Sequence, residues 1–85
     1  MKKYEIRFTK EAVKDIRKLS DRETGKLQDI LLKQVAQNPR SGKRLFGDLK
    51  GFFSIRLSYR DRILYSIDDE ENIIYVHRAR THYGD

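Results

Sequence analysis

From Phe52 onward, apolar and polar residues alternate with a period of two, which is the pattern of half-buried β-strands. The first run predicts an apolar core face and a polar solvent face: Phe53, Ile55, Leu57 and Tyr59 lie on one, and Ser54, Arg56, Ser58 and Arg60 on the other. A tight turn over 59–61 leads to a second strand over 62–67, and the acidic segment 68–72 leads to a third strand over 73–79. The third strand is partly apolar on both sides, which predicts an interior position in the sheet.

The N-terminal half predicts one strand and two helices. Residues 3–8 alternate like the later strands, and Thr9 is a suitable cap for a helix that ends near Leu19. Ser20 and Glu23 have the spacing of a capping box, which marks the start of a second helix. The apolar residues of the two helices recur at three- and four-residue spacing: Ala12, Val13, Ile16 and Leu19, then Leu27, Ile30, Leu31 and Val35. Asn38-Pro39 ends the second helix, because the residue before a proline avoids the α region.

This order of elements predicts an α+β fold. We expect an antiparallel twisted sheet of four to five strands that includes the N-terminal strand. An antiparallel pair of helices is expected to pack on one face of this sheet. Residues 40–51 contain three glycines and no clear period, so they are predicted to form a loop or short irregular strand. Leu45, Phe46 and Leu49 are expected to hold this loop against the core. A chain of 85 residues without repeats or linkers indicates a single domain over residues 1–85.

The composition narrows the classes of partner. The formal net charge of +6 favours a polyanion, although the same charges also serve to keep a small domain soluble. The sequence has no cysteine, which excludes disulfides and thiolate metal sites and favours the cytoplasm over secretion. It contains neither a signal peptide nor a run of about 20 apolar residues, so we expect no membrane partner.

Basic residues concentrate between residues 40 and 62: Arg40, Lys43, Arg44, Lys50, Arg56, Arg60 and Arg62. Strand periodicity puts Arg56 on the polar face, and the hairpin brings Arg62 back towards it. Guanidinium groups held in this way grip a phosphate and stabilise the charge of a pentacoordinate transition state. The alternative is a solvated strand face, with Arg60-Asp61 as ordinary turn polarity.

The C-terminal end carries His82-Tyr83 after Arg78-Ala79-Arg80-Thr81. Histidine suits general acid or base catalysis near neutral pH, and a phenol orients or stacks a nucleotide base. A nuclease that uses the RNA 2′-OH needs a proton acceptor, a proton donor and a cation, and this tail has candidates for all three. The alternative is a frayed end without function. His77 shares its side of the strand with Tyr75 and Ile73, so it is predicted to be a packed core histidine and not a ligand.

Other chemistries find little support in the sequence. There is no glycine-rich phosphate loop and no His-Cys metal constellation, and the acidic run 68–71 lacks the spacing of a calcium loop. We interpret that run as a solvated turn. No metal and no cofactor are expected.

Together these motifs resemble the RelE/ParE superfamily of type II toxins. The resemblance covers nearly the whole chain, including residues 8–12, the helices, the Gly-Phe-Phe-Ser-Ile-Arg segment 51–56, the Arg-Ile-Leu-Tyr segment 62–65 and the His-Tyr ending. The ending is similar to that of the YoeB branch. Members of this kind are mRNA interferases that cut mRNA in the ribosomal A site without a metal, by 2′-OH attack that leaves a 2′,3′-cyclic phosphate.

The resemblance also implies roles for individual residues. Arg62 matches the arginine that contacts the scissile phosphate, and Arg56 a basic position just upstream. His82 matches the general acid, and Tyr83 the neighbouring tyrosine that orients the substrate. The remaining predicted RNA-binding residues are Lys43, Arg44, Lys50, Arg60, Arg78 and Arg80. The implied partners are the 70S ribosome with its mRNA and a cognate acidic antitoxin, which forms a hetero-oligomer by wrapping over the basic sheet face.

The sequence departs from the family pattern at two places. The YoeB branch has a glutamate base before the central hairpin, whereas this chain reads Lys43-Arg44-Leu45 there and has no carboxylate until Asp48. The general base is therefore open; Lys43 or Arg44 could assist, but a lysine would need a lowered pKa to accept a proton. Ser54 stands where RelE-type members often carry lysine. Two alternative functions remain: a ParE-like toxin that inhibits DNA gyrase without cleaving RNA, and a non-catalytic RNA- or ribosome-binding module.

Overall fold

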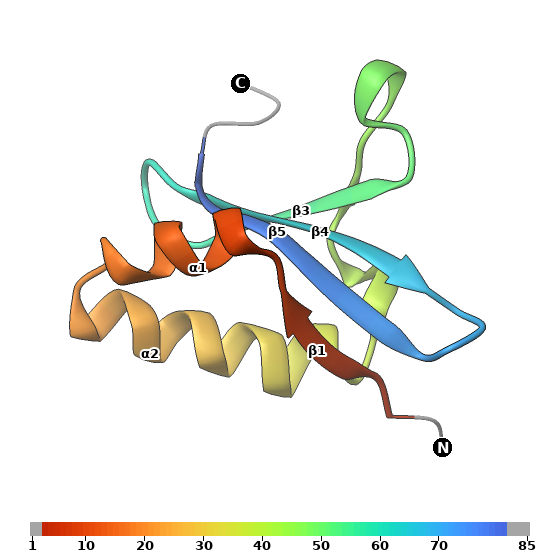
Figure 1. Cartoon of the computed structure of the whole chain (residues 1–85), viewed down its shortest axis with the longest axis horizontal. Coiled ribbons are helices and arrows are strands. Elements are labelled where there is room, and N and C mark those ends of the chain that lie inside the picture. Colours follow the sequence, from red (N-terminus) through yellow and green to blue (C-terminus); the bar gives the residue numbers. More distant parts are fainter. Residues whose placement is uncertain (1–2, 82–85) are drawn as a thin grey trace.

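The computed structural model describes residues 3–81, which form a sheet with helices on one face. The strands are β1 (Glu5–Phe8), β2 (Lys43–Arg44), β3 (Phe52–Arg56), β4 (Arg62–Asp68) and β5 (Ile73–Thr81). The helices are α1 (Lys10–Arg17) and α2 (Asp21–Asp29), which continues as the π-helical stretch η1 (Ile30–Val35); two short 3-10 turns follow, η2 (Pro39–Ser41) and η3 (Gly47–Leu49). Figure 1 shows α1 and α2 on the same side of the sheet, and the expected α+β class is confirmed.

The sheet has five strands in the order β1-β5-β4-β3-β2. Strands β2 to β5 are antiparallel neighbours, because short connections join each to the next. The expectation of a wholly antiparallel sheet was wrong for one pair, since β1 runs parallel to β5 with Ile6 beside Ile74. A tight turn dictates the direction of the strand that follows, but β1 and β5 are far apart in the chain. The path through the helices sets their relative direction, and residue alternation does not encode that path.

Both helices begin at the residues that the sequence indicates. The Thr9 side chain accepts a hydrogen bond from the N–H of Ala12, and Ser20 and Glu23 form both bonds of the capping box. In η1 the N–H of Ala36 donates to the carbonyl of Leu31, five residues earlier, at 2.8 Å. This wider turn places Leu31 and both Val35 and Ala36 in buried positions. None of the helices within residues 3–81 is long and apolar enough to cross a membrane.

The core lies between the helices and the sheet. It comprises Ala12, Leu27, Leu31, Val35, Leu57, Ile63, Tyr65, Ile74 and Val76. Most apolar positions of the predicted helix stripes are at least partly buried, and β5 is interior as expected. Four large apolar residues expected on core-facing positions are exposed instead: Phe8, Val13, Phe46 and Tyr59. Phe8 ends an edge strand, Phe46 and Tyr59 lie outside the strands, and Val13 lies at the margin of the apolar face of α1, so none of these four has a layer packed over it.

An ion pair with a buried carboxylate and a half-buried guanidinium joins α1 to β5. The Arg78 guanidinium donates to both carboxylate oxygens of Asp15, at 2.8 and 3.2 Å, and the N–H of Ala79 donates to the same carboxylate at 3.0 Å. Asp15 is only 6% exposed. Burial raises the pKa of this carboxyl group, but the bonds from Arg78 and Ala79 and the charge of Arg78 outweigh burial, so the pKa lies below its ordinary value. The sequence did offer a signal, since Asp15 interrupts the apolar stripe between Ala12 and Leu19.

Removing the Asp15 carboxylate is expected to weaken the fold substantially. Asp15→Ala leaves the Arg78 guanidinium and the Ala79 N–H without their acceptor, and we expect a loss of about 3 kcal/mol in the free energy of unfolding. Urea denaturation at neutral pH measures this loss. The matched control is Asp29→Ala at the end of α2, which breaks an exposed pair with Lys33 of η1 and should change stability by less than about 0.5 kcal/mol. Equal effects of the two substitutions would contradict the assignment.

The pH dependence of stability tests the same carboxylate. Because the pKa of Asp15 is lowered by folding, its contribution is complete above the pKa of an unfolded aspartate, about 3.9, and is lost as the pH falls through the lower pKa of the folded state. We therefore expect the stability difference between wild type and Asp15→Asn to be constant from pH 7 to pH 5 and to shrink below about pH 4. Denaturation curves across this range measure the difference, and a gap that stays constant down to pH 2 would rule out the lowered pKa.

Candidate functional site

Two arginines face each other on the side of the sheet away from the helices. Arg56 on β3 lies directly opposite Arg62 on β4 in the antiparallel register. Side chains alternate along a strand, and Phe53 and Tyr65 belong to the helix side, so Arg56 and Arg62 share the other face. We call this surface the open face. Like charges at opposed positions repel each other, so an anion placed between them would relieve the repulsion.

Ser54 forms a hydrogen bond with one of the two arginines. Its hydroxyl oxygen accepts a hydrogen bond from Nη1 of Arg62 at 3.3 Å, and the residue is only 2% exposed. The expectation that Ser54 lies on a solvated face was wrong, because Leu64 and Lys43 flank it in the sheet on either side. The open face is therefore wet at its arginine end and packed in its middle, and Ser54 helps to direct the Arg62 guanidinium.

The turn between β3 and β4 holds the hairpin together. The carbonyl of Asp61 accepts hydrogen bonds from the N–H groups of Leu57 and Ser58, and the N–H of Asp61 donates to the Ser58 hydroxyl at 3.1 Å. These bonds place Tyr59 and Arg60 at an exposed tip. Arg60 is thus on the hairpin but outside the Arg56–Arg62 register.

His77 lies half-buried on the open face of β5. Its Nε2 is 2.8 Å from the Ser66 hydroxyl, and its ring packs edge-on against Phe52 with centroids 4.9 Å apart. Burial lowers the pKa of His77, because it disfavours the charged form of the imidazole. These contacts agree with the prediction that His77 is packed, but the expectation that it belongs to the core was wrong, because it lies half-buried on the face opposite the helices.

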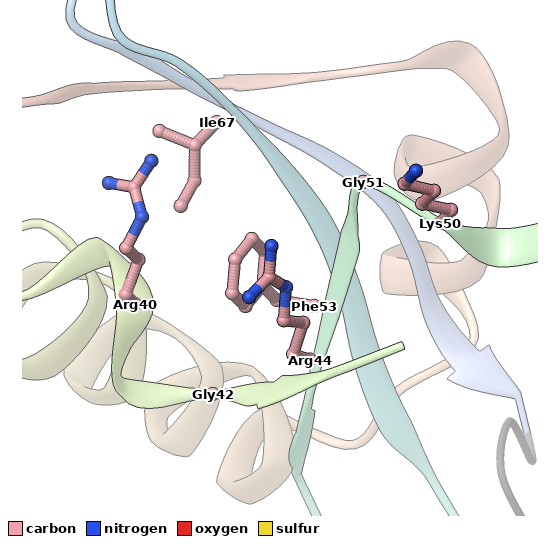
Figure 2. A pocket seen from close by; sticks show the side chains of 7 residues that line it. All are labelled: Arg40, Gly42, Arg44, Lys50, Gly51, Phe53 and Ile67. Atoms are coloured by element: carbon pink, nitrogen blue, oxygen red, sulfur yellow. The ribbon is translucent and has the colours of Figure 1, made fainter. Parts of the chain in front are cut away.

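The other predicted RNA-binding residues are divided between surfaces. Lys43 pairs with Ser54 and belongs to the open face, whereas Arg44 pairs with Phe53 and belongs to the helix side. Lys50 joins Arg44 around a pocket of about 450 Å³ on that side, shown in Figure 2.

The C-terminal candidates are only partly described. Arg80 is exposed near the end of β5, while Arg78 donates to Asp15 and is half-buried. The backbone of Thr81 pairs with Arg62, so β5 brings the chain beside the arginine pair. His82 and Tyr83 lie outside the described residues, and their catalytic roles stay predictions. No cluster of His, Asp and Glu that could hold a metal ion occurs within residues 3–81.

Comparisons with known proteins establish the family to which this chain belongs. The family model described as a ParE-like toxin of type II bacterial toxin-antitoxin systems matches residues 6–83. Toxin RelG of Mycobacterium tuberculosis is 36% identical over 77 residues, which span 89% of this chain and 87% of RelG. The chain is a type II toxin of the RelE/ParE superfamily.

Solved structures agree with this assignment. The toxin superimposes on a chain of the toxin-antitoxin complex RelBE2 from Mycobacterium tuberculosis with a TM-score of 0.85 and 34% identity, covering 96% of this chain and 94% of that one. It superimposes on YoeB from Staphylococcus aureus, solved as a dimer, with a TM-score of 0.78 and 28% identity, covering 96% of this chain and all of that one. The fold expected from the sequence resemblance is therefore confirmed.

The opposed arginines predict a measurable strain. Arg56→Gln removes the repulsion with Arg62 and should raise the melting temperature by about 2 °C at low salt. The gain should disappear in about 1 M salt, where charges on the surface are screened. The control is Arg60→Gln, which removes the same charge from the tip of the same hairpin and should have a smaller effect. Thermal unfolding by circular dichroism measures both, and a lower melting temperature for Arg56→Gln would contradict the prediction.

Proposed function

We propose that the toxin is an endoribonuclease that cuts mRNA on the ribosome without a metal ion. The observation that carries the proposal is the cross-strand pair of Arg56 and Arg62, with Arg62 held by Ser54, on the face of the sheet opposite α1 and α2. The site of action would be the cytoplasm, where translated mRNA is found. The family assignment and the RelE- and YoeB-like fold support this reading.

The proposed reaction is an internal transesterification. The 2′-oxygen attacks the adjacent phosphorus, the bond from phosphorus to the 5′-oxygen breaks, and the products are a 2′,3′-cyclic phosphate and a 5′-hydroxyl end. Arg62 and Arg56 would bind the non-bridging oxygens and stabilise the charge that develops on them. His82 would protonate the leaving 5′-oxygen, and Tyr83 would orient the neighbouring nucleotide. The group that takes the proton from the 2′-OH is not assigned.

The flanking cations would hold the RNA backbone. Lys43 lies on the open face and Arg60 at the hairpin tip. Contacts of this kind position the strand without reading its sequence. Arg80 alternates with Thr81, the partner of Arg62, so it projects to the helix side. Its charge acts there on the Glu23 carboxylate, and that it binds RNA stays a prediction. That Arg78 also binds RNA stays a prediction; at least two of its nitrogens donate to Asp15.

We also propose an acidic antitoxin as the partner that keeps the toxin inactive in a hetero-oligomer. The printed descriptions of similar structures name toxin-antitoxin complexes, among them RelBE2. A chain of opposite charge that covers the open face would occupy the phosphate site and block access of mRNA.

Substituting the arginine of the site tests the proposed activity. Arg62→Ala should lower cleavage of translated mRNA about 100-fold or more, because it removes a charged donor to the transition state. His82→Ala should cause a comparable loss, and Arg62→Lys should retain part of the activity. Primer extension on mRNA bound to purified ribosomes measures the cleavage. Lys33→Ala, an exposed change on the helix layer, is the matched control and should cleave like wild type.

The alternatives lead to different results in the same experiment. Unchanged cleavage and growth arrest in Arg62→Ala and His82→Ala would show that the site is wrong. Gyrase-dependent DNA damage with intact mRNA would identify a ParE-like activity. Salt-sensitive binding to ribosomes without cleavage in any ribosomal context would leave a plain binding module.

A further inference from the structure

A basic pocket lies on the side of the sheet opposite the arginine pair. Its volume is about 450 Å³, within the range of small-molecule sites. Figure 2 shows its lining, with Arg40 and Lys50 at opposite ends. The lining residues are Arg40, Gly42, Arg44, Lys50, Gly51, Phe53 and Ile67.

Two of the three cations in this pocket have no ion-pair partner in the part of the chain that the structure describes. Arg40 donates to Asp69 at 2.7 Å, so its charge is largely matched. Neither Arg44 nor Lys50 forms an ion pair with any residue in the described range 3–81. The pocket therefore has an excess of positive charge and favours an anionic ligand.

The floor of the pocket is aromatic, and hydrogen bonds fix the ring of Tyr65 beneath it. One face of the Phe53 ring stacks on Tyr65, with centroids 5.6 Å apart and planes inclined by 18°, and Phe53 remains partly exposed. The Tyr65 hydroxyl donates to the Pro39 carbonyl at 2.7 Å and accepts from the N–H of Gly42 at 3.1 Å. A Cβ atom on Gly42 would lie 2.6 Å from that hydroxyl, so only glycine fits against it.

The pocket also adjoins the open face through the edge strand. β2 is the outermost strand and consists of only Lys43 and Arg44, which project to opposite sides of the sheet. A flexible polyanion that passes over this edge would meet Lys43 on the open face and then Arg44 at the pocket. Cations along a path, combined with an aromatic platform, are the usual means of binding single-stranded nucleic acid.

We propose that this pocket binds one nucleotide of the single-stranded RNA substrate, at a distance from the scissile phosphate. Arg44 and Lys50 bind its phosphate, and its base packs on Phe53 beside Ile67. The proposal rests on the proposed function and extends it, because it assigns the substrate a path across β2. An acidic peptide would satisfy the two cations equally well, but the aromatic floor and the continuity with the open face favour RNA.

Binding of an uncleavable RNA tests the pocket. The probe is a fluorescent octauridylate with 2′-O-methyl groups, which lacks the attacking hydroxyl, and fluorescence anisotropy of the full-length toxin at several salt concentrations gives its affinity. The double variant Arg44→Ala/Lys50→Ala should bind at least about tenfold more weakly, and the slope of log affinity against log salt should fall by about 0.7, as expected when one phosphate of a single strand is no longer neutralised. Phe53→Leu should weaken binding about tenfold without a change of slope.

Two controls keep the test decisive. Lys26→Ala/Lys33→Ala removes the same charge from the exposed surface of the helix layer and should leave most of the affinity and slope intact. Thermal unfolding shows whether Phe53→Leu is folded, and Phe53→Tyr, which keeps the aromatic ring, should bind like wild type.

The outcomes separate this inference from the proposed function. Wild-type affinity and slope in the Arg44→Ala/Lys50→Ala variant would overturn the pocket assignment, even if Arg62→Ala abolishes cleavage. Loss of binding in that variant, with cleavage unaffected by Arg62→Ala, would support the pocket and overturn the proposed catalytic site. A third result, in which poly-glutamate binds the pocket while the RNA does not, would make it a protein-docking site and would also overturn the inference.

Discussion

The buried carboxylate of Asp15 is the interaction on which the arrangement of the two layers depends. Charge inside a protein is tolerated only where it is matched, and here a guanidinium and a backbone N–H of β5 supply the match. Because Arg78 and Ala79 lie close to the point where Thr81 pairs with Arg62, the same contact sets the position of the helix layer and of the strand end beside the arginine pair. Stability and the geometry of the candidate site are therefore linked through one side chain.

The local features of the fold were largely predictable from the sequence. Thr9 and the Ser20–Glu23 box begin the helices as expected, because capping depends on residues only three positions apart. The alternation of side chains along β3 and the short turn after it were enough to predict that Arg56 and Arg62 lie together. What failed was non-local: the direction of β1 relative to β5 depends on the path of the chain through two helices, and the exposure of Phe46 depends on whether another layer covers the loop.

Within the candidate site, the sequence predicted which charged residues take part, but it did not predict their burial or the side of the sheet on which they lie. Ser54 was expected to be solvated, and only its neighbours in the sheet explain its burial. The two residues of β2 are too few to show a period, so the separation of Lys43 from Arg44 by the sheet could not be foreseen. Arg40 comes from a different part of the chain than Phe53 and Ile67, and only the fold unites them in one pocket. Basic residues that are close together in the sequence therefore lie on two different surfaces of the folded chain.

The π-helical stretch limits how this chain can change in length. An α-helix turns by about 100° per residue, so one residue more or less rotates everything that follows by that angle. The turn from Leu31 to Ala36 absorbs one extra residue and returns the chain to Asn38-Pro39 in the correct phase to enter β2. A deletion there would give a more regular helix but would turn the segment that carries Arg40 and Arg44 away from the sheet. In relatives of this toxin, a change of length at this point should therefore be accompanied by a compensating change before the edge strand.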